Sequence, residues 1–156
     1  MGGTSAISAG TITNDDINSA TAIAASKTQT YICKTYRQVT GTAITDQTAI
    51  PVHIVRGATM TILSVDAAWY TQASQTAGHD KHVEVNVLVD GTTVLSGSMV
   101  DILTATASLG VVEGTISDAT HAHDQIVTVA VNEAGATGTQ GQGLIVEIRM
   151  VEDYPA

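Results

Sequence analysis

Phenylalanine is absent from this sequence of 156 residues, which also contains only one tryptophan, one cysteine and two prolines. Because Cys33 is the single cysteine, no disulfide bond can form within the chain, and stability must come from burial and from association with other chains. A core with so few aromatic residues has to be built from Val, Ile, Leu, Met and Ala, and the β-branched residues among these favour strands. The absences therefore predict a β-rich body without covalent cross-links.

Charged residues are also scarce. They make up 13% of the chain, with six basic and fifteen acidic residues. The net charge of −9 would repel a phosphate backbone, so we expect no nucleic acid among the partners. The first 26 residues contain neither Lys nor Arg, which argues against a secretion signal and for synthesis in the cytoplasm. The chain also lacks a run of about eighteen apolar residues, so we expect no membrane contact.

Period-two alternation is the strongest pattern that the sequence contains. Valine stands at every second position from Val83 to Val89, and the Asp90-Gly91 pair that follows provides the positive φ angles of a tight hairpin turn. Eight strands are expected, over residues 29–38, 47–55, 58–66, 82–89, 92–100, 109–117, 124–132 and 143–151. Short strands at regular spacing, with no helical period between them, predict an all-β fold that is an antiparallel eight-stranded β-sandwich.

The chain divides into an N-terminal arm, residues 1–26, and a sandwich domain, residues 27–156. The arm is small and polar and has too few bulky apolar groups to offset the entropy of ordering alone. Two interpretations stay open: a disordered tail, or an arm that becomes ordered against neighbouring subunits. In the second interpretation the contact residues of the arm are Ile12, Asp15, Asp16, Ile17 and Ile23.

Four of the six basic residues, Lys27, Lys34, Arg37 and Arg56, lie within the first 56 positions. One interpretation is scattered surface charge of no functional consequence. The other is a basic surface that docks on an acidic protein lattice, where complementary potentials guide orientation. The second interpretation makes these four residues candidates for partner binding.

The nearest approach to a metal site is the segment 118–124, in which His121 and His123 are two residues apart. Such histidines point the same way on an extended segment and suit zinc, but a tetrahedral site needs more ligands, so the favoured interpretation is a polar turn that leads into the strand at residue 124. The pair His79 and His82 flanks Asp80 and Lys81 without a recognisable pocket, and no Gly-x-Ser-x-Gly motif is present. We therefore expect no enzyme activity, no metal and no cofactor.

Trp69 and Tyr70 could stack on a sugar, as aromatic side chains do in carbohydrate-binding sandwiches. The sequence favours a different role, because a lone tryptophan in a chain without phenylalanine is a natural packing anchor for the core.

Four stretches carry a resemblance to a known family: residues 49–56, 83–96, 111–116 and 138–148. In strand order, turn placement and composition, residues 47–151 resemble the small jelly-roll decoration (cement) proteins of tailed-bacteriophage heads. The resemblance implies an eight-stranded jelly roll that assembles as a homotrimer and binds the major capsid protein on the capsid exterior. It brings no catalytic residue or cofactor, and it places the protein in the virion after synthesis in the host cytoplasm.

Proteins with other functions also have all-β sandwich folds, and three alternatives to a decoration protein stay open. A head fibre, collar or tail protein would be another part of the virion. A carbohydrate-binding sandwich would use Trp69 and Tyr70, and a metal-dependent enzyme of the cupin type would need His121 and His123 to converge with a further histidine and a carboxylate. Fold alone does not choose among these functions.

Overall fold

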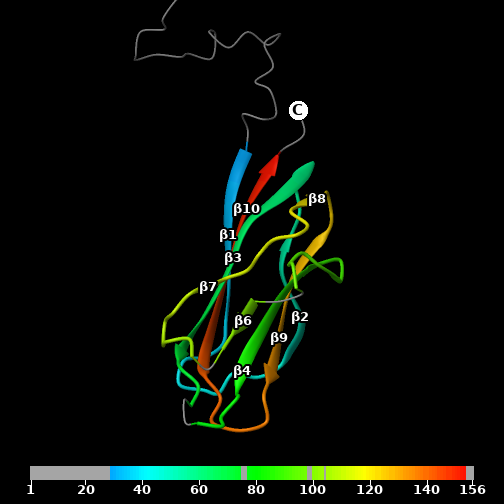
Figure 1. The fold of residues 1–156 in the computed structure, drawn as a ribbon. Helices are drawn as coiled ribbons and strands as arrows, with labels where there is room; N and C mark the ends of the chain where they lie inside the picture. The colour runs from blue at the N-terminus through cyan, green and yellow to red at the C-terminus, as the bar shows by residue number, and fades with distance from the viewer. Residues whose placement is uncertain (1–28, 75–76, 98–99, 104, 154–156) are drawn as a thin grey trace, which may run out of the picture.

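A computed structural model describes residues 29–74, 77–97, 100–103 and 105–153, and there the chain forms ten strands and no helix (Figure 1). The strands are β1 (Gln29–Arg37), β2 (Gln47–Ile54), β3 (Thr59–Thr71), β4 (His82–Val89), β5 (Thr92–Thr93), β6 (Val100–Ile102), β7 (Val112–Glu113), β8 (Thr120–Ala122), β9 (Ile126–Ala134) and β10 (Gln142–Asp153). Since this part of the chain has no helix, it also has none that could cross a membrane.

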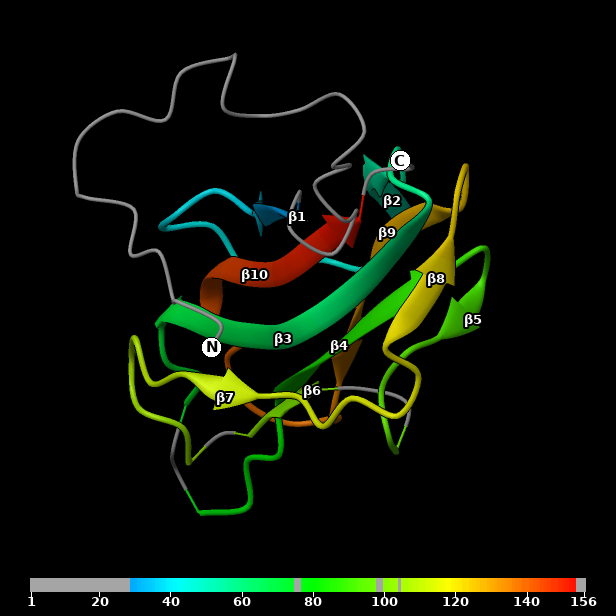
Figure 2. The same cartoon turned by 90° about the horizontal axis from the view of Figure 1, so that it is seen from above.

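The strands build two antiparallel sheets that face one another, so the predicted all-β antiparallel sandwich is confirmed (Figure 2). Sheet A has the order β1-β10-β3-β7, and β8 pairs with β3 farther along the edge that β7 occupies. Sheet B has the order β2-β9-β4-β5, and β6 shares an edge of β4 with β5 in the same way. Each sheet is therefore four strands wide, with two short strands in succession along one edge.

Six of the eight strand pairings are nested along the chain. The first strand pairs with the last, β2 pairs with β9, β3 with β7 and β8, and β4 with β5 and β6, whereas the pairs β3–β10 and β4–β9 join the successive turns of this hairpin into sheets. Residues 29–153 thus follow one long antiparallel hairpin that is rolled into two layers. Its turn is Asp90-Gly91, where both φ angles are positive, at 49° and 82°, as the sequence predicts for a two-residue hairpin turn.

Alternation decides which side chains enter the core between the sheets. The alternate valines of β4 and β9 are at most 3% exposed, and so are the alternate apolar residues of β10 from Leu144 to Met150. Trp69 on β3 is fully buried, and Gly141 lies flat against its ring, since a Cβ atom at that position would be 2.5 Å from Trp69 Cε3. The core therefore has the Val, Ile, Leu and Met composition that the sequence predicts.

The number of strands differs from the prediction, with ten found in the described residues instead of eight. The expected strand 92–100 is interrupted at Gly97, which has a φ of +80°, and becomes β5 and β6. The expected strand 109–117 is reduced to the two residues of β7, because Gly114 brings the chain within contact of Val100 and Leu95 instead of continuing along the sheet edge. Residues 120–122, which the sequence suggests as a turn, form β8.

Candidate functional site

A shallow groove runs along the open side of the sandwich between β1 and β2, each an edge strand of its sheet. We call it the edge groove. It is lined by Lys34, Pro51, Val52, His53, Ile54 and Arg56. Two of the predicted basic residues, Lys34 and Arg56, therefore come together here from different parts of the chain.

Lys34 occupies an unusual position, on the inward face of β1 between Ile32 and Tyr36, which both pack against the core. A lysine that points inward at a sheet edge discourages another strand from adding to that edge. On the facing strand, Pro51 removes one backbone donor, and the pairing of β2 with β9 is irregular around it. Both edges are thus protected against random β-pairing, so the groove presents charge and side chains to a partner.

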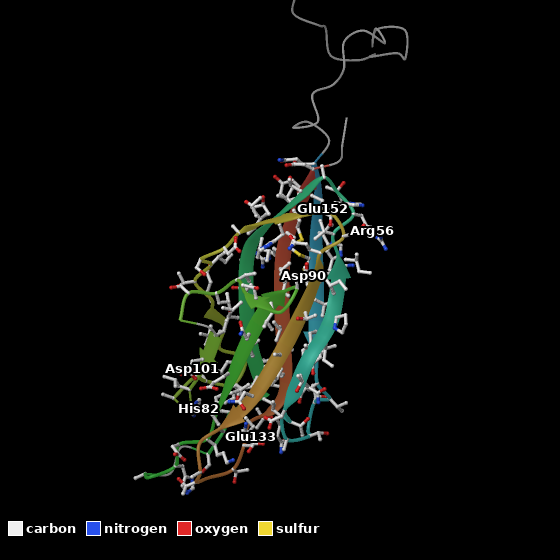
Figure 3. All side chains as sticks on the ribbon, turned by 90° about the vertical axis from the view of Figure 1, so that its right-hand side faces the viewer. Arg56, His82, Asp90, Asp101, Glu133 and Glu152 are labelled. Carbon is white, nitrogen blue, oxygen red and sulfur yellow. The ribbon has the colours of Figure 1, made fainter. Side chains whose placement is uncertain are left out.

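Glu152 lies behind the groove and positions one of its walls. Its side chain is buried, and its Oε1 atom lies 2.5 Å from His53 Nε2, while its Oε2 accepts a hydrogen bond of 2.8 Å from the backbone N–H of Gly57. The backbone N–H of Arg56 also donates to this carboxylate, at 3.2 Å. Figure 3 shows Glu152 and Arg56 together at one end of the body. The carboxylate of the last strand therefore holds the β2–β3 connection, from which the Arg56 side chain extends into solvent.

The environment of Glu152 favours its charged form. Burial by itself would raise the pKa, but the hydrogen bonds from His53 and from the backbone N–H groups of Arg56 and Gly57 outweigh it and hold the pKa of Glu152 below its ordinary value. A buried anion thus lies next to the basic groove. The Arg56 guanidinium makes an exposed contact of 3.5 Å with Asp124 and is largely open to solvent, so it is accessible to a partner.

Arg37, the third described basic candidate, does not join the edge groove. It is exposed on the outer face of sheet A, where it lies opposite Ile145 of β10. The other predicted contact residues, Ile12, Asp15, Asp16, Ile17, Ile23 and Lys27, lie outside the described residues, as does the whole predicted arm.

The two candidate metal ligands have separate environments. His121 is buried on β8, and its Nε2 donates to the carbonyl oxygen of Asp118 at 3.2 Å. The His123 ring is half-exposed, and its Nδ1 donates to the carbonyl oxygen of Gly57 at 3.1 Å. Within the described residues, no group of three or more His, Cys, Asp or Glu side chains could hold a metal ion.

Trp69 and Tyr70 point to opposite sides of β3, as neighbouring residues of a strand do. The Trp69 indole is fully buried, and its Nε1 donates to the carbonyl oxygens of Thr106 and Ala107, at 3.0 and 3.3 Å. Tyr70 is 51% exposed on the outside. They do not form a joint aromatic platform, and Trp69 has the packing role that the sequence favours.

At the end of the body opposite Glu152, the segment 77–82 contacts the glycine-rich loop between β9 and β10. Asp80 accepts hydrogen bonds from the backbone N–H of Thr137 at 2.7 Å and from its hydroxyl at 2.9 Å. Together with the backbone N–H of Ala136, these bonds lower the pKa of Asp80 to about 2. Lys81 pairs with Glu133. These polar residues fasten two loops to each other.

Sequence reasoning missed Glu152, which falls just beyond the expected last strand. Only its partners show its importance, and they come from the other sheet and from the β2–β3 connection. A weak signal was nevertheless present, because Glu152 continues the every-second-residue pattern of inward positions 144–150 and places a charge there.

Comparison with known proteins identifies no family. No family model matches the chain, and no curated protein shows significant similarity to it.

Proposed function

We propose that this protein is a structural virion protein that decorates the exterior of a tailed-phage capsid and stabilises it as a cement protein. In this proposal its partner is the major capsid protein, and it assembles as a homotrimer. The observation that carries the proposal is the nested pairing of β1 with β10, β2 with β9, β3 with β7 and β8, and β4 with β5 and β6, in a hairpin whose turns the pairs β3–β10 and β4–β9 join into two sheets.

Nested pairing supports the finer assignment of the sandwich as a jelly roll. A jelly roll is a double sheet of eight strands, and the two four-strand-wide sheets correspond to it when β5 with β6 and β7 with β8 each count as one interrupted edge strand. Viral capsid proteins are among the proteins that use this architecture. The interrupted edges also limit uncontrolled pairing between copies, because short edge strands are poor templates.

The edge groove is the surface that we assign to the capsid. Lys34 and Arg56 place positive charge on a chain that carries a net charge of −9, so a groove of this sign can orient the molecule on an acidic surface. In the proposal, residues 1–26 add contacts next to the groove, because β1 follows them closely in the chain. Three linked copies would multiply weak contacts through their high effective concentration.

The test is co-sedimentation of the purified full chain with undecorated capsids, after light scattering has given its mass. We expect the protein to pellet with the capsids, and we expect removal of residues 1–26 to abolish pelleting while the circular dichroism of the body is retained. The double variant Lys34→Gln/Arg56→Gln should bind at least about ten-fold more weakly, which corresponds to about 1.4 kcal/mol.

The matched control, Lys81→Gln/Arg149→Gln, removes the same charge elsewhere and should bind as the unmodified chain does. Capsids that never retain the full chain, or density at the collar or tail of the virion, would refute the proposal.

A further inference from the structure

The two long sides of the sandwich differ in how the sheets meet. On one side, residues 94–96, which follow β5, and residues 115–117, which follow β7, exchange backbone hydrogen bonds of 2.7 and 2.9 Å. On the side of the edge groove, no backbone hydrogen bond joins β1 to β2 among the residues that the structure describes. The sandwich is therefore closed on one side and open along the edge groove.

The core is incompletely covered on the open side. Ile32 and Tyr36 on the inward face of β1, and Val52 on β2, pack against the core but are partly exposed. Lys34 lies between Ile32 and Tyr36 on the same face, and it has no ion pair with any described residue. A partly covered apolar row with a cation at its centre is a surface that another chain can complete.

The backbone of β1 has a free edge beside these side chains. The N–H of Gln38 donates to the carbonyl oxygen of Leu144 at 2.9 Å, and the register of β1 with β10 has no shift. Even-numbered residues of β1 therefore direct their N–H and C=O groups to β10, and odd-numbered residues direct theirs away from it. The odd-numbered residues in the middle of the strand are Tyr31, Cys33 and Thr35. Within the described ranges, no strand pairs with this second edge of β1.

We infer that the edge groove binds an extended segment of the capsid protein, which adds to β1 as a further strand of sheet A. The inference rests on the proposed function, and it specifies the form of the partner at that same site. Every second side chain of an added strand points inward. The one next to Lys34 carries a carboxylate, and the inward side chains before and after it are apolar and cover Ile32 and Tyr36. The partner segment thus has the pattern apolar-x-acidic-x-apolar.

Lys34 makes this strand addition selective. A strand with an apolar side chain next to Lys34 would bury the ammonium group without a partner, which is unfavourable. A carboxylate at that position pairs with the ammonium group, so the residue that hinders most strands favours one with an acidic side chain in register. Arg56, farther along the groove, provides a second positive charge for the same segment.

Proline at the free edge tests the strand addition. Cys33→Pro removes one N–H from that edge and keeps the hydrogen bonds with β10, because the N–H of Cys33 faces away from β10. We expect about ten-fold weaker binding in co-sedimentation with undecorated capsids, since a backbone hydrogen bond is lost and the proline ring hinders the added strand. The matched control Cys33→Ser keeps the N–H and should bind as the unmodified chain does. Circular dichroism should show the same fold for both variants.

Amide hydrogen exchange of the unmodified chain gives a second measurement. Binding to capsids should slow exchange at the alternate residues Tyr31, Cys33 and Thr35, because the added strand accepts hydrogen bonds from their N–H groups. The N–H groups of Ile32 and Lys34 already face β10, so their exchange should change little.

Three results would overturn the inference. Equal capsid binding by Cys33→Pro and Cys33→Ser, or unchanged exchange at the alternate residues of β1, would exclude strand addition and leave the proposed function intact. A lower light-scattering mass of free Cys33→Pro, but not of free Cys33→Ser, would mean that the added strand comes from another copy of this chain instead of the capsid protein. An unmodified chain that does not bind capsids would refute the proposed function and this inference together.

Discussion

The two ends of the sandwich each rely on a carboxylate that accepts backbone hydrogen bonds, yet the two carboxylates differ in their exposure. At one end, buried Glu152 binds His53 and the N–H groups of Arg56 and Gly57. At the other end, exposed Asp80 binds the N–H and hydroxyl of Thr137. Figure 3 shows the separation, with Glu152 and Arg56 at one end and His82 and Glu133 at the other.

The same type of interaction, a carboxylate that accepts backbone hydrogen bonds, has different consequences for stability at the two ends. Both carboxylates have a lowered pKa, because both accept hydrogen bonds that favour the charged form. If Glu152 were removed, its buried donors would have no water to replace it, whereas water reaches the donors around Asp80 freely. We therefore expect Glu152 to determine the stability of the whole body and Asp80 to determine only the local order of the loops.

The largest expected effect is that of Glu152→Ala, which removes a buried charge and leaves His53 and two backbone N–H groups without their acceptor. We expect the free energy of unfolding to fall by about 3 to 5 kcal/mol, as when one partner of a buried ion pair is removed. Urea denaturation followed by circular dichroism measures this change.

The matched control is Glu133→Ala at the opposite end, which breaks the partly exposed contact with Lys81. It should cost less than about 1 kcal/mol, because exposed ion pairs contribute little. Equal losses for the two variants would mean that burial of Glu152 does not distinguish the two ends.

The second effect is acid sensitivity. In the unfolded chain Glu152 takes its ordinary pKa of 4.5, and in the folded chain its pKa is lower, so the unfolded state binds more protons between those two values. The stabilisation is complete above pH 4.5 and is lost as the pH falls through the lower pKa of the folded state. The loop contacts of Asp80 weaken in a more acidic window, because its pKa is lowered from 3.8 to about 2.

Urea denaturation over a series of pH values measures this loss. The variant Glu152→Gln should be less stable at neutral pH and should lose less stability below pH 4.5 than the unmodified chain does. If both chains have the same pH dependence, the charge of Glu152 is not what stabilises that end of the sandwich.

The smallest effect is expected for Asp80→Asn. Its exposed donors can bond to water, so the thermal unfolding midpoint should stay within experimental error of that of the unmodified chain. Amide hydrogen exchange at Thr137 should nevertheless become faster, because the N–H of Thr137 loses its charged acceptor. A clear drop in the unfolding midpoint would show that the loops and the body unfold together.

Much of the fold was predictable from local patterns. The hairpin at Asp90-Gly91 and the long strands β1, β2, β4, β9 and β10 follow from alternation and turn chemistry. Most errors fall on the edges, where the expected strands 92–100 and 109–117 shorten and β8 appears at residues 120–122, while the central strand β3 continues to Thr71, past the expected end at residue 66. Edge strands have one neighbour instead of two, so glycines such as Gly97 and Gly114 redirect them more easily than they redirect a central strand.

The candidate site was less predictable than the fold. The bias of basic residues toward the first third of the chain singled out Lys34 and Arg56, which share the edge groove, but the same bias included Arg37, which lies on another face. On the outer face of sheet A, Glu147, Asp66 and Glu113 lie opposite one another on β10, β3 and β7. This row of carboxylates had no signal along the chain, because the three residues are far apart in sequence and meet only through strand pairing.

The sequence by itself determined which side of each long strand is apolar, because the two-residue period of a strand is a local property. It also determined the turn at Asp90-Gly91 and the scarcity of charged residues. Only the tertiary structure decided that Glu152 meets His53 and Gly57, that Lys34 and Arg56 line one groove, and that three carboxylates share a row on the outer face of sheet A. The physical reason is that side-chain direction depends on neighbours along the chain, whereas the choice of adjacent strands depends on pairing between segments that are distant in sequence.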